Sequence, residues 1–193
     1  YLLGWIGPFD DREKLARAVA SENAFKTVLD YSSPNTAKQM HVGHIRSTII
    51  GESLARLLAF CGHEVTRDNH LGDWGTQFGI LLYAIKREGA SLDDLGDDPV
   101  AELEDLYRKG NAWTKEDEGA LAEARGELVG LQGGDPESMS LWERIREISM
   151  ESFQTIYDLL GVRFDHAHGE SFYRDRVDQV YDSLLRHGIC EEN

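Results

Sequence analysis

The spacing of apolar residues predicts a helix, a strand and a second helix in the first third of the chain. A short helix is predicted over 10–23 and is followed by a strand over 25–31, where β-branched and aromatic residues gather. Pro34 excludes helix just after that strand. Apolar residues then recur at a helical period from 40 to 61, and Gly62 is a natural left-handed stop.

The same alternation continues with a strand at 65–69, a glycine-rich turn at 72–75 and a helix at 76–87. Repeated strand–loop–helix units predict an α/β fold, with a parallel sheet and crossover helices. Ligands of such sheets bind beyond the carboxyl ends of the strands. We therefore expect a site in the loops at 31–41 and 70–76.

The second half of the chain is mainly helical. Residues 91–135 are polar and predict one or two helices that cover the sheet or join subdomains. A long helix follows over 136–160, and Gly161 ends it. A strand at 162–166 and a helix at 174–187 are predicted last. The apolar stripe of the long helix is expected at Leu141, Ile145, Ile148, Ile156 and Leu159.

These patterns divide the chain into four parts. We expect a lead-in segment at 1–24, the first half of a catalytic domain at 25–90, a helical connective insertion at 91–135 and a return to the catalytic domain at 136–193. The chain does not begin with Met, so we expect it to be a piece of a longer protein. Its opening residues are too few, and lack the basic flank, for a signal peptide.

The net charge of −15 is confined to one half of the chain. Residues 1–90 hold ten acids and ten bases, whereas residues 91–193 hold twenty-five acids and ten bases. An acidic surface repels phosphate backbones, so the second half is a poor nucleic-acid groove. The neutral half is therefore where we expect an anionic ligand.

Composition narrows the class of protein. A hydrophobic share of 41% excludes a disordered chain. No apolar run approaches the ~18–20 residues of a membrane span, so no membrane partner is expected. Two cysteines, Cys61 and Cys190, cannot form a disulfide framework and are expected to be small buried residues. A reducing, cytoplasmic location fits this usage.

The loop after the first strand carries the most informative chemistry. His41 and His44 lie three apart at a predicted helix start, and Gly43 between them lets a flat ring or a phosphate approach the backbone. A helix N-terminus offers unpaired N–H groups and partial positive charge, and Lys38 and Arg46 add charge nearby. The pattern favours a nucleoside triphosphate site.

The four residues His-Val-Gly-His alone are also compatible with a helix cap and a buried structural histidine. A zinc site built from His41, His44, Cys61 and His63 is the remaining interpretation. Zinc ligands normally form a tighter cluster or a recognisable pair spacing, so we expect no metal site.

Three segments give the chain a family resemblance. They are 30–52, which reads DYSSPNTAKQMHVGHIRSTIIGE; 69–79, which reads NHLGDWGTQFG; and 169–173, which reads GESFY. In this order they resemble the signatures of class I arginyl-tRNA synthetases, and the resemblance spans about 25–190. A His-x-Gly-His element is shared by many nucleotidyltransferases, whereas the flanking residues are much more specific to the arginine enzyme. Thr36 and Gln39 differ from the commoner family residues.

The resemblance implies a Rossmann-like catalytic domain that activates L-arginine with ATP, as its Mg²⁺ complex, and transfers it to tRNA(Arg). His41 and His44 match residues that contact ATP and stabilise charge at the α-phosphate, and His44 also lies beside the amino acid. By the same analogy Gly43 lines the ATP site, and Lys38 matches a lysine that supports the phosphates. The arginine-binding positions of the family correspond here to Asp30, Ser33, Asn35 and His44.

Purely structural roles for some of these residues stay open. Asp30 could cap or pair within its loop, Lys38 could be a solvated charge, and Asn35 is a natural turn residue. Trp74 is expected to pack beneath the active-site loop. The roles of Glu170 and Tyr173 are left undecided.

The chain stops before the lysine-rich second signature and the other parts that complete the site in the family. We therefore expect this piece alone to be unable to charge tRNA, and tRNA to bind mainly through regions outside it. Two alternatives stay open, which are another nucleotidyl-transferring or adenylate-forming enzyme of this fold and a non-catalytic interaction module.

Overall fold

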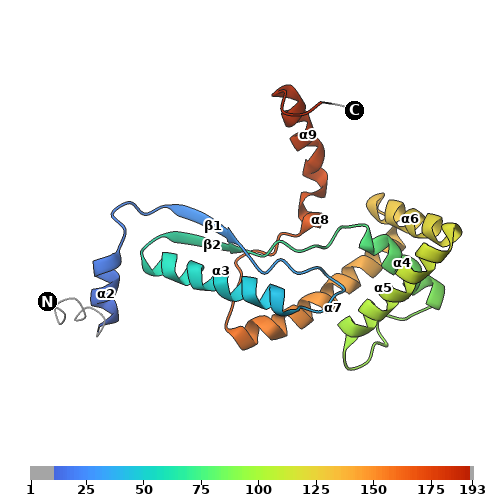
Figure 1. Cartoon of the computed structure of the whole chain (residues 1–193), viewed down its shortest axis with the longest axis horizontal. Helices are drawn as coiled ribbons and strands as arrows, with labels where there is room; N and C mark the ends of the chain where they lie inside the picture. Colours follow the sequence, from blue (N-terminus) through green and yellow to red (C-terminus); the bar gives the residue numbers. More distant parts are fainter. Residues whose placement is uncertain (1–10, 192–193) are drawn as a thin grey trace.

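The computed structural model describes residues 11–191, and two parallel strands lie at its centre (Figure 1). Strand β1 (Lys26–Asp30) pairs with β2 (Glu64–Asp68) in a register that sets Asp30 opposite Asp68. Helix α3 (Val42–Phe60) connects the two strands and packs on both. The predicted α/β arrangement with a parallel sheet and a crossover helix is confirmed.

The end of α3 agrees with the prediction, whereas the bounds of the first helix do not. Gly62 follows α3 with φ +90°, a conformation that a residue with a side chain rarely adopts. The first described helix, α2 (Arg12–Val19), is shorter than the predicted 10–23. It begins where the Asp11 side chain accepts hydrogen bonds from the backbone N–H groups of Glu13 and Lys14. Residue 10 lies outside the described part.

Three helices form a separate layer beyond the second strand. They are α4 (Gln77–Glu88), α5 (Pro99–Glu116) and α6 (Glu118–Gln132), and they pack on one another. Figure 1 shows this group at the opposite end of the molecule from α2. Of the two roles predicted for the helices of 91–135, covering the sheet is wrong, because their apolar sides face α4 and α7. The predicted boundary at residue 90 thus separates α4 from the helices it packs against.

Helix α7 (Pro136–Leu160) runs beneath both parts (Figure 1). Its first half joins the core of α4 and α5, and its second half joins a smaller core with Tyr31, Leu71 and Val162. The predicted stripe is only partly right, since Ile145 and Ile148 are buried but Leu159 is 85% exposed. The buried residues of this helix are Ser138, Trp142, Ile145, Ile148, Ser149, Phe153 and Tyr157.

The strand predicted at 162–166 is wrong, because only His166 pairs with β2, in an isolated bridge to Asp68. The Asp165 side chain accepts the N–H of Arg67, so a side chain stands where a regular ladder needs a backbone carbonyl. The chain then forms α8 (Glu170–Tyr173), a 3-10 turn at Arg174–Arg176 and α9 (Val177–Arg186), which projects from the body (Figure 1).

None of the helices within 11–191 is long and apolar enough to cross a membrane.

A buried carboxylate ties the sheet to its crossover helix. Glu52 of α3 is 8% exposed and accepts hydrogen bonds from the Tyr31 hydroxyl at 2.7 Å, Arg56 Nε at 2.6 Å and Arg67 Nε at 3.2 Å. Burial alone raises the pKa of Glu52, but these three donors outweigh it and hold the pKa below its ordinary value. Burial, and then the bond to Glu52, raise the pKa of Tyr31.

We expect Glu52→Gln to reduce the free energy of unfolding at pH 7 by about 1–3 kcal/mol, because the amide cannot accept all three donors. A carboxyl group whose folded pKa is lowered stabilises the protein above its unfolded pKa and loses that contribution as pH falls through the folded value. Urea unfolding at several pH values should show the difference between the two proteins shrinking below the ordinary value of 4.5.

The matched control for this prediction is Glu64→Gln on β2, whose carboxylate pairs with Lys26 at 3.0 Å on the exposed surface. Its effect should stay within about 0.5 kcal/mol, because exposed ion pairs contribute little. Equal losses in the two variants, or a loss in Glu52→Gln that does not depend on pH, would contradict the role given to the buried cluster.

Candidate functional site

The loop after β1 is held in a strained conformation. Ser32, Ser33 and Ala37 have φ values of +74°, +51° and +59°, which residues with a side chain rarely adopt. Each such residue costs on the order of 1–3 kcal/mol and persists only where its surroundings fix it. The chain therefore gives up stability to hold this loop in one defined shape.

Side chains from outside the loop supply the contacts that hold it. Ser32 Oγ shares a 2.9 Å hydrogen bond with the buried Tyr157 hydroxyl, and that hydroxyl also accepts from Asn69 Nδ2 at 3.0 Å. Asn69 Oδ1 accepts the N–H of Ser33, and Ser149 Oγ accepts the N–H of Ala37 at 2.8 Å. The strained positions are thus each tied to the residue after β2 or to α7.

His41 and His44 cap the start of α3 for each other. The N–H of Gly43 donates to His41 Nδ1 at 3.1 Å, and the N–H of His41 donates to His44 Nδ1 at 3.3 Å. The two rings stack with centroids 3.9 Å apart. A Cβ on Gly43 would lie 2.8 Å from the His41 ring, so the flat group that the missing side chain admits is that ring.

This capping fixes the tautomers of the two rings. Because Nδ1 accepts in both, a neutral ring carries its proton on Nε2. Within residues 11–191 no hydrogen bond uses Nε2 of either His41 or His44. Burial, followed by the nearby His41, lowers the pKa of His44 below 6.5, so His44 is neutral at pH 7.

Asp30, Ser33 and Asn35 lie together at the carboxyl end of β1. Asp30 Oδ1 accepts a hydrogen bond from Ser33 Oγ at 3.1 Å and one from the N–H of His70 at 3.4 Å. Asn35 lies on Gly72, where a Cβ would overlap its Oδ1 atom. All three residues are exposed. The hydrogen bond from Ser33 thus accounts for part of the position of Asp30. Because Asp30 stays exposed, a ligand can still reach its carboxylate.

The Lys38 side chain lies against helix α5. Its Nζ lies 5.2 Å from the centre of the Tyr107 ring of α5, a cation–π geometry. The next residue, Gln39, donates to Asp98 at the start of α5. Within the described part, no hydrogen bond joins Lys38 or the two histidines to Asp30, Ser33 or Asn35.

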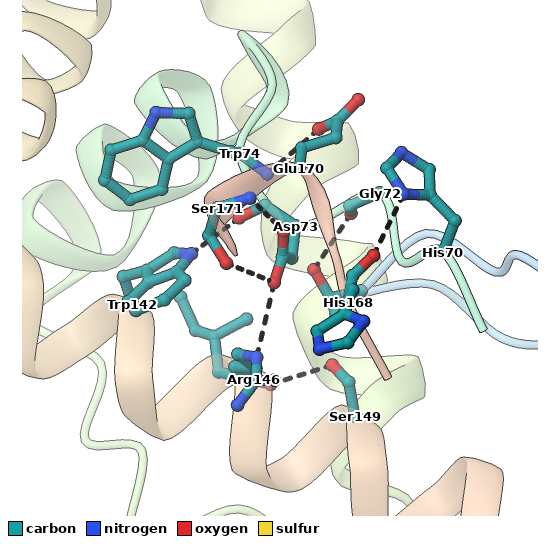
Figure 2. Close-up of polar contacts among 12 residues, drawn as sticks. His70, Gly72, Asp73, Trp74, Trp142, Arg146, Ser149, His168, Glu170 and Ser171 are labelled. Atoms are coloured by element: carbon teal, nitrogen blue, oxygen red, sulfur yellow. Dashed lines mark hydrogen bonds and ion pairs between the residues drawn. The ribbon is translucent and has the colours of Figure 1, made fainter. Parts of the chain in front are cut away.

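Asp73, which belongs to the 69–79 segment but received no role from the sequence, has no exposed surface. Its carboxylate accepts from Ser171 N at 2.8 Å, Ser171 Oγ at 2.8 Å and Arg146 Nε at 3.3 Å, as Figure 2 shows. Its backbone carbonyl accepts from Trp142 Nε1 at 2.7 Å. The signals in the sequence were its place in the 69–79 segment and in a glycine-rich turn, and an acid in such a turn usually serves the turn itself.

Trp74 packs against Trp142 of α7. Its ring meets Trp142 edge to face with centroids 5.3 Å apart, and the Arg174 guanidinium lies 5.0 Å above it. The N–H of Trp74 donates to Glu170 Oε2 at 3.0 Å, which gives Glu170 a structural contact. Tyr173 lies near His70, with ring centroids 5.8 Å apart.

One groove lies apart from the loop after β1 and the start of α3. It is open, has a volume of about 820 Å³, and is lined by residues of α2, the last turns of α3 and Arg67, at the opposite end of α3 from His41. Among residues 11–191 no group of three or more His, Cys, Asp or Glu side chains is arranged to hold a metal ion.

Comparison with known proteins identifies the family. The family described as "tRNA synthetases class I (R), catalytic domain" matches residues 11–193. The chain belongs to this class I arginyl-tRNA synthetase family. An arginine–tRNA ligase of Chloroflexus aggregans is 49% identical over 172 residues, which are 89% of this chain and 30% of that protein. One from Acanthamoeba polyphaga mimivirus is 45% identical over 159 residues, 82% of this chain and 26% of that protein.

Solved structures of arginyl-tRNA synthetases superpose on this chain. The arginyl-tRNA synthetase of Plasmodium falciparum is 32% identical and superposes with a TM-score of 0.68, covering 91% of this chain and 29% of that one. The Thermus thermophilus synthetase, 24% identical with a TM-score of 0.57, covers 93% of this chain and 29% of its own, and it shows the same fold. The Rossmann-like class I fold is therefore confirmed. The chain spans about 30% of the length of the curated family members it matches.

We expect an NMR titration of His44 to give a midpoint below 6.5 and a neutral ring protonated on Nε2. His41→Asn keeps a helix-capping acceptor but removes the neighbouring charge. It should raise the His44 midpoint without restoring it to 6.5, because burial is the larger cause. A lowered pKa also means that the native state resists protonation, so stability should fall as pH drops below 6.5. A midpoint above 6.5 would contradict this environment.

Proposed function

We propose that the protein is an arginine–tRNA ligase, which activates L-arginine with Mg²⁺·ATP to arginyl-adenylate and transfers it to tRNA(Arg). The observation that carries this proposal is the start of α3, where two stacked histidines have Nε2–H donors free at a helix N-terminus within the described residues. Donors already fixed in place stabilise charge that develops on the α-phosphate more than charge already present in ATP. His41, Gly43 and His44 form the ATP side of this proposal.

The arginine side consists of Asp30, Ser33 and Asn35. Asp30 lies at the carboxyl end of β1, where ligands of parallel sheets bind, and its exposed carboxylate suits a planar guanidinium. Ser33 and Asn35 are the polar groups for the α-amino and carboxylate ends of the substrate. The strained backbone between them supports this role, because such strain concentrates at ligand sites.

Lys38 completes the phosphate side if its side chain leaves Tyr107. A cation–π contact at a partly exposed position is worth about 0.5–1 kcal/mol, so a triphosphate can draw the ammonium group away. Magnesium enters with ATP as part of the substrate. We further propose a cytoplasmic location, and tRNA contacts chiefly outside this acidic chain.

The test is arginine-dependent exchange of pyrophosphate into ATP by the full-length protein, with tRNA present. We expect arginine, and no other amino acid, to support exchange. His44→Ala should lower the rate ~10²–10³-fold while the protein stays folded, as removal of a charge-stabilising donor does. Exchange driven by a different amino acid would overturn the proposal. Near-normal exchange by folded His44→Ala would remove His44 from the chemistry.

We expect Asp30→Asn to raise the Michaelis constant for arginine at least about tenfold and to leave that for ATP nearly unchanged. A guanidinium loses its charged partner in this variant, whereas the phosphate site keeps its donors. Ser33→Ala removes the hydroxyl that donates to Asp30 but keeps the carboxylate. Its Michaelis constants for arginine and ATP are compared with those of Asp30→Asn. Equal increases for arginine and ATP in Asp30→Asn would show that Asp30 only shapes the loop.

A further inference from the structure

The Asp73 carboxylate is a charge with no exposed surface. Burying such a group is costly unless charged and hydrogen-bonding partners surround it. Arg146 supplies the charge, and Ser171 supplies two donors from its backbone and side chain. A Cβ at Gly169 would overlap the Asp73 carboxyl group, so the segment before Ser171 approaches it closely. The site is closed around this one carboxylate.

Asp73 joins three segments that are far apart in the sequence. It belongs to the turn after β2, Arg146 belongs to α7 and Ser171 belongs to α8, and Figure 2 shows the three side chains converging. Trp142 of α7 adds a hydrogen bond to the Asp73 carbonyl. The position of the turn is therefore set by α7 and α8 together.

Gly72, the residue before Asp73, joins this turn to the loop after β1 by hydrogen bonds. The Gly72 carbonyl accepts hydrogen bonds from the N–H and the hydroxyl of Thr36, at 3.1 Å and 3.2 Å. The N–H of Gly72 donates to the carbonyl of Pro34 at 3.1 Å. Asn35 lies between these two bonded residues, directly on Gly72. A shift of Gly72 must therefore shift Asn35.

The ATP side has anchors of its own. Ala37 is tied to Ser149 of α7, and the α3 start is capped by its own two histidines. None of these contacts passes through Asp73. A disturbance at Asp73 should therefore reach Asn35 and leave the histidine pair in place.

We infer that Asp73 is the positioning residue of the arginine subsite: through Gly72 it fixes Asn35 against the substrate's α-amino and carboxylate groups. This inference rests on the proposed function. Asp73 itself is enclosed and contacts no substrate, so its effect is on the precision of the loop. Misplacement of a binding group by about 1 Å can lower catalytic efficiency ~10²-fold.

The experiment compares wild type, Asp73→Asn and Ser171→Ala in the full-length protein. Asp73→Asn removes the charge but keeps the shape, and Ser171→Ala removes one donor and is the gentler change. Both should raise the Michaelis constant for arginine, Asp73→Asn by about tenfold or more, and leave that for ATP within about twofold. Hydrogen exchange should show faster amide exchange at Thr36 and Gly72, because their mutual contacts loosen.

Ser138→Ala is the matched control. Ser138 is also a buried polar residue of α7, but its hydroxyl contacts Lys86 and Glu127 in the layer of α4 and α6. It should lower the melting temperature without changing either Michaelis constant or the exchange at Thr36. The difference between the two kinds of variant separates positioning from general stability.

The inference would be overturned if folded Asp73→Asn and Ser171→Ala proteins kept the wild-type Michaelis constant for arginine. It would also be overturned if the Michaelis constants for arginine and ATP rose together and Ser138→Ala gave the same rise. Wild-type protein without arginine-dependent exchange would instead overturn the proposed function. Amide exchange at Thr36 and Gly72 would then still decide whether Asp73 controls the loop, since that measurement needs no activity.

Discussion

One face of α7 holds the loops that the candidate site is made of. Along this face Arg146 and Trp142 bind Asp73, Ser149 binds the backbone at Ala37, and Tyr157 binds Ser32 and Asn69. Two five-residue strands cannot fix such loops alone, and three loop positions have φ values that need external support. The helix supplies that support because it is long and packs into both cores.

Opposite electrostatic preferences meet at the carboxyl ends of the strands. Asp30 and Asp68 lie side by side in the register, which favours a cation there. The α3 start offers N–H groups, a partial positive charge and two histidines, which favour an anion. A cation and an anion are thus favoured at different points of the segment from β1 to α3, and separate hydrogen bonds hold the two points.

Sequence patterns predicted the helix ends that depend on the backbone preference of a single residue. Gly62 and Gly161 follow the ends of helices as predicted, and the chain around Pro34 is not helical, because each residue restricts or permits particular φ values. The start of α3 was predicted from the apolar period that begins near Met40, and the structure shows that the two histidines cap it. The strand expected at 162–166 failed, since its apolar pattern could not show that the Asp165 side chain would take the N–H of Arg67. Asp73 was missed because its partners Arg146 and Ser171 are about 73 and 98 residues away in the sequence.

The sequence by itself determined the order of strands and helices up to residue 160, the carboxyl-end loops and the histidine pair. Periodicity, caps and turn residues act over a few positions, so a local pattern is enough to reveal them. Only the tertiary structure decided which face of α7 is buried. An apolar count favoured Leu159, whereas the buried face includes Ser149 and Tyr157. The reason is that this face meets loop backbone as well as apolar side chains, and buried backbone groups require polar partners that no local pattern reveals.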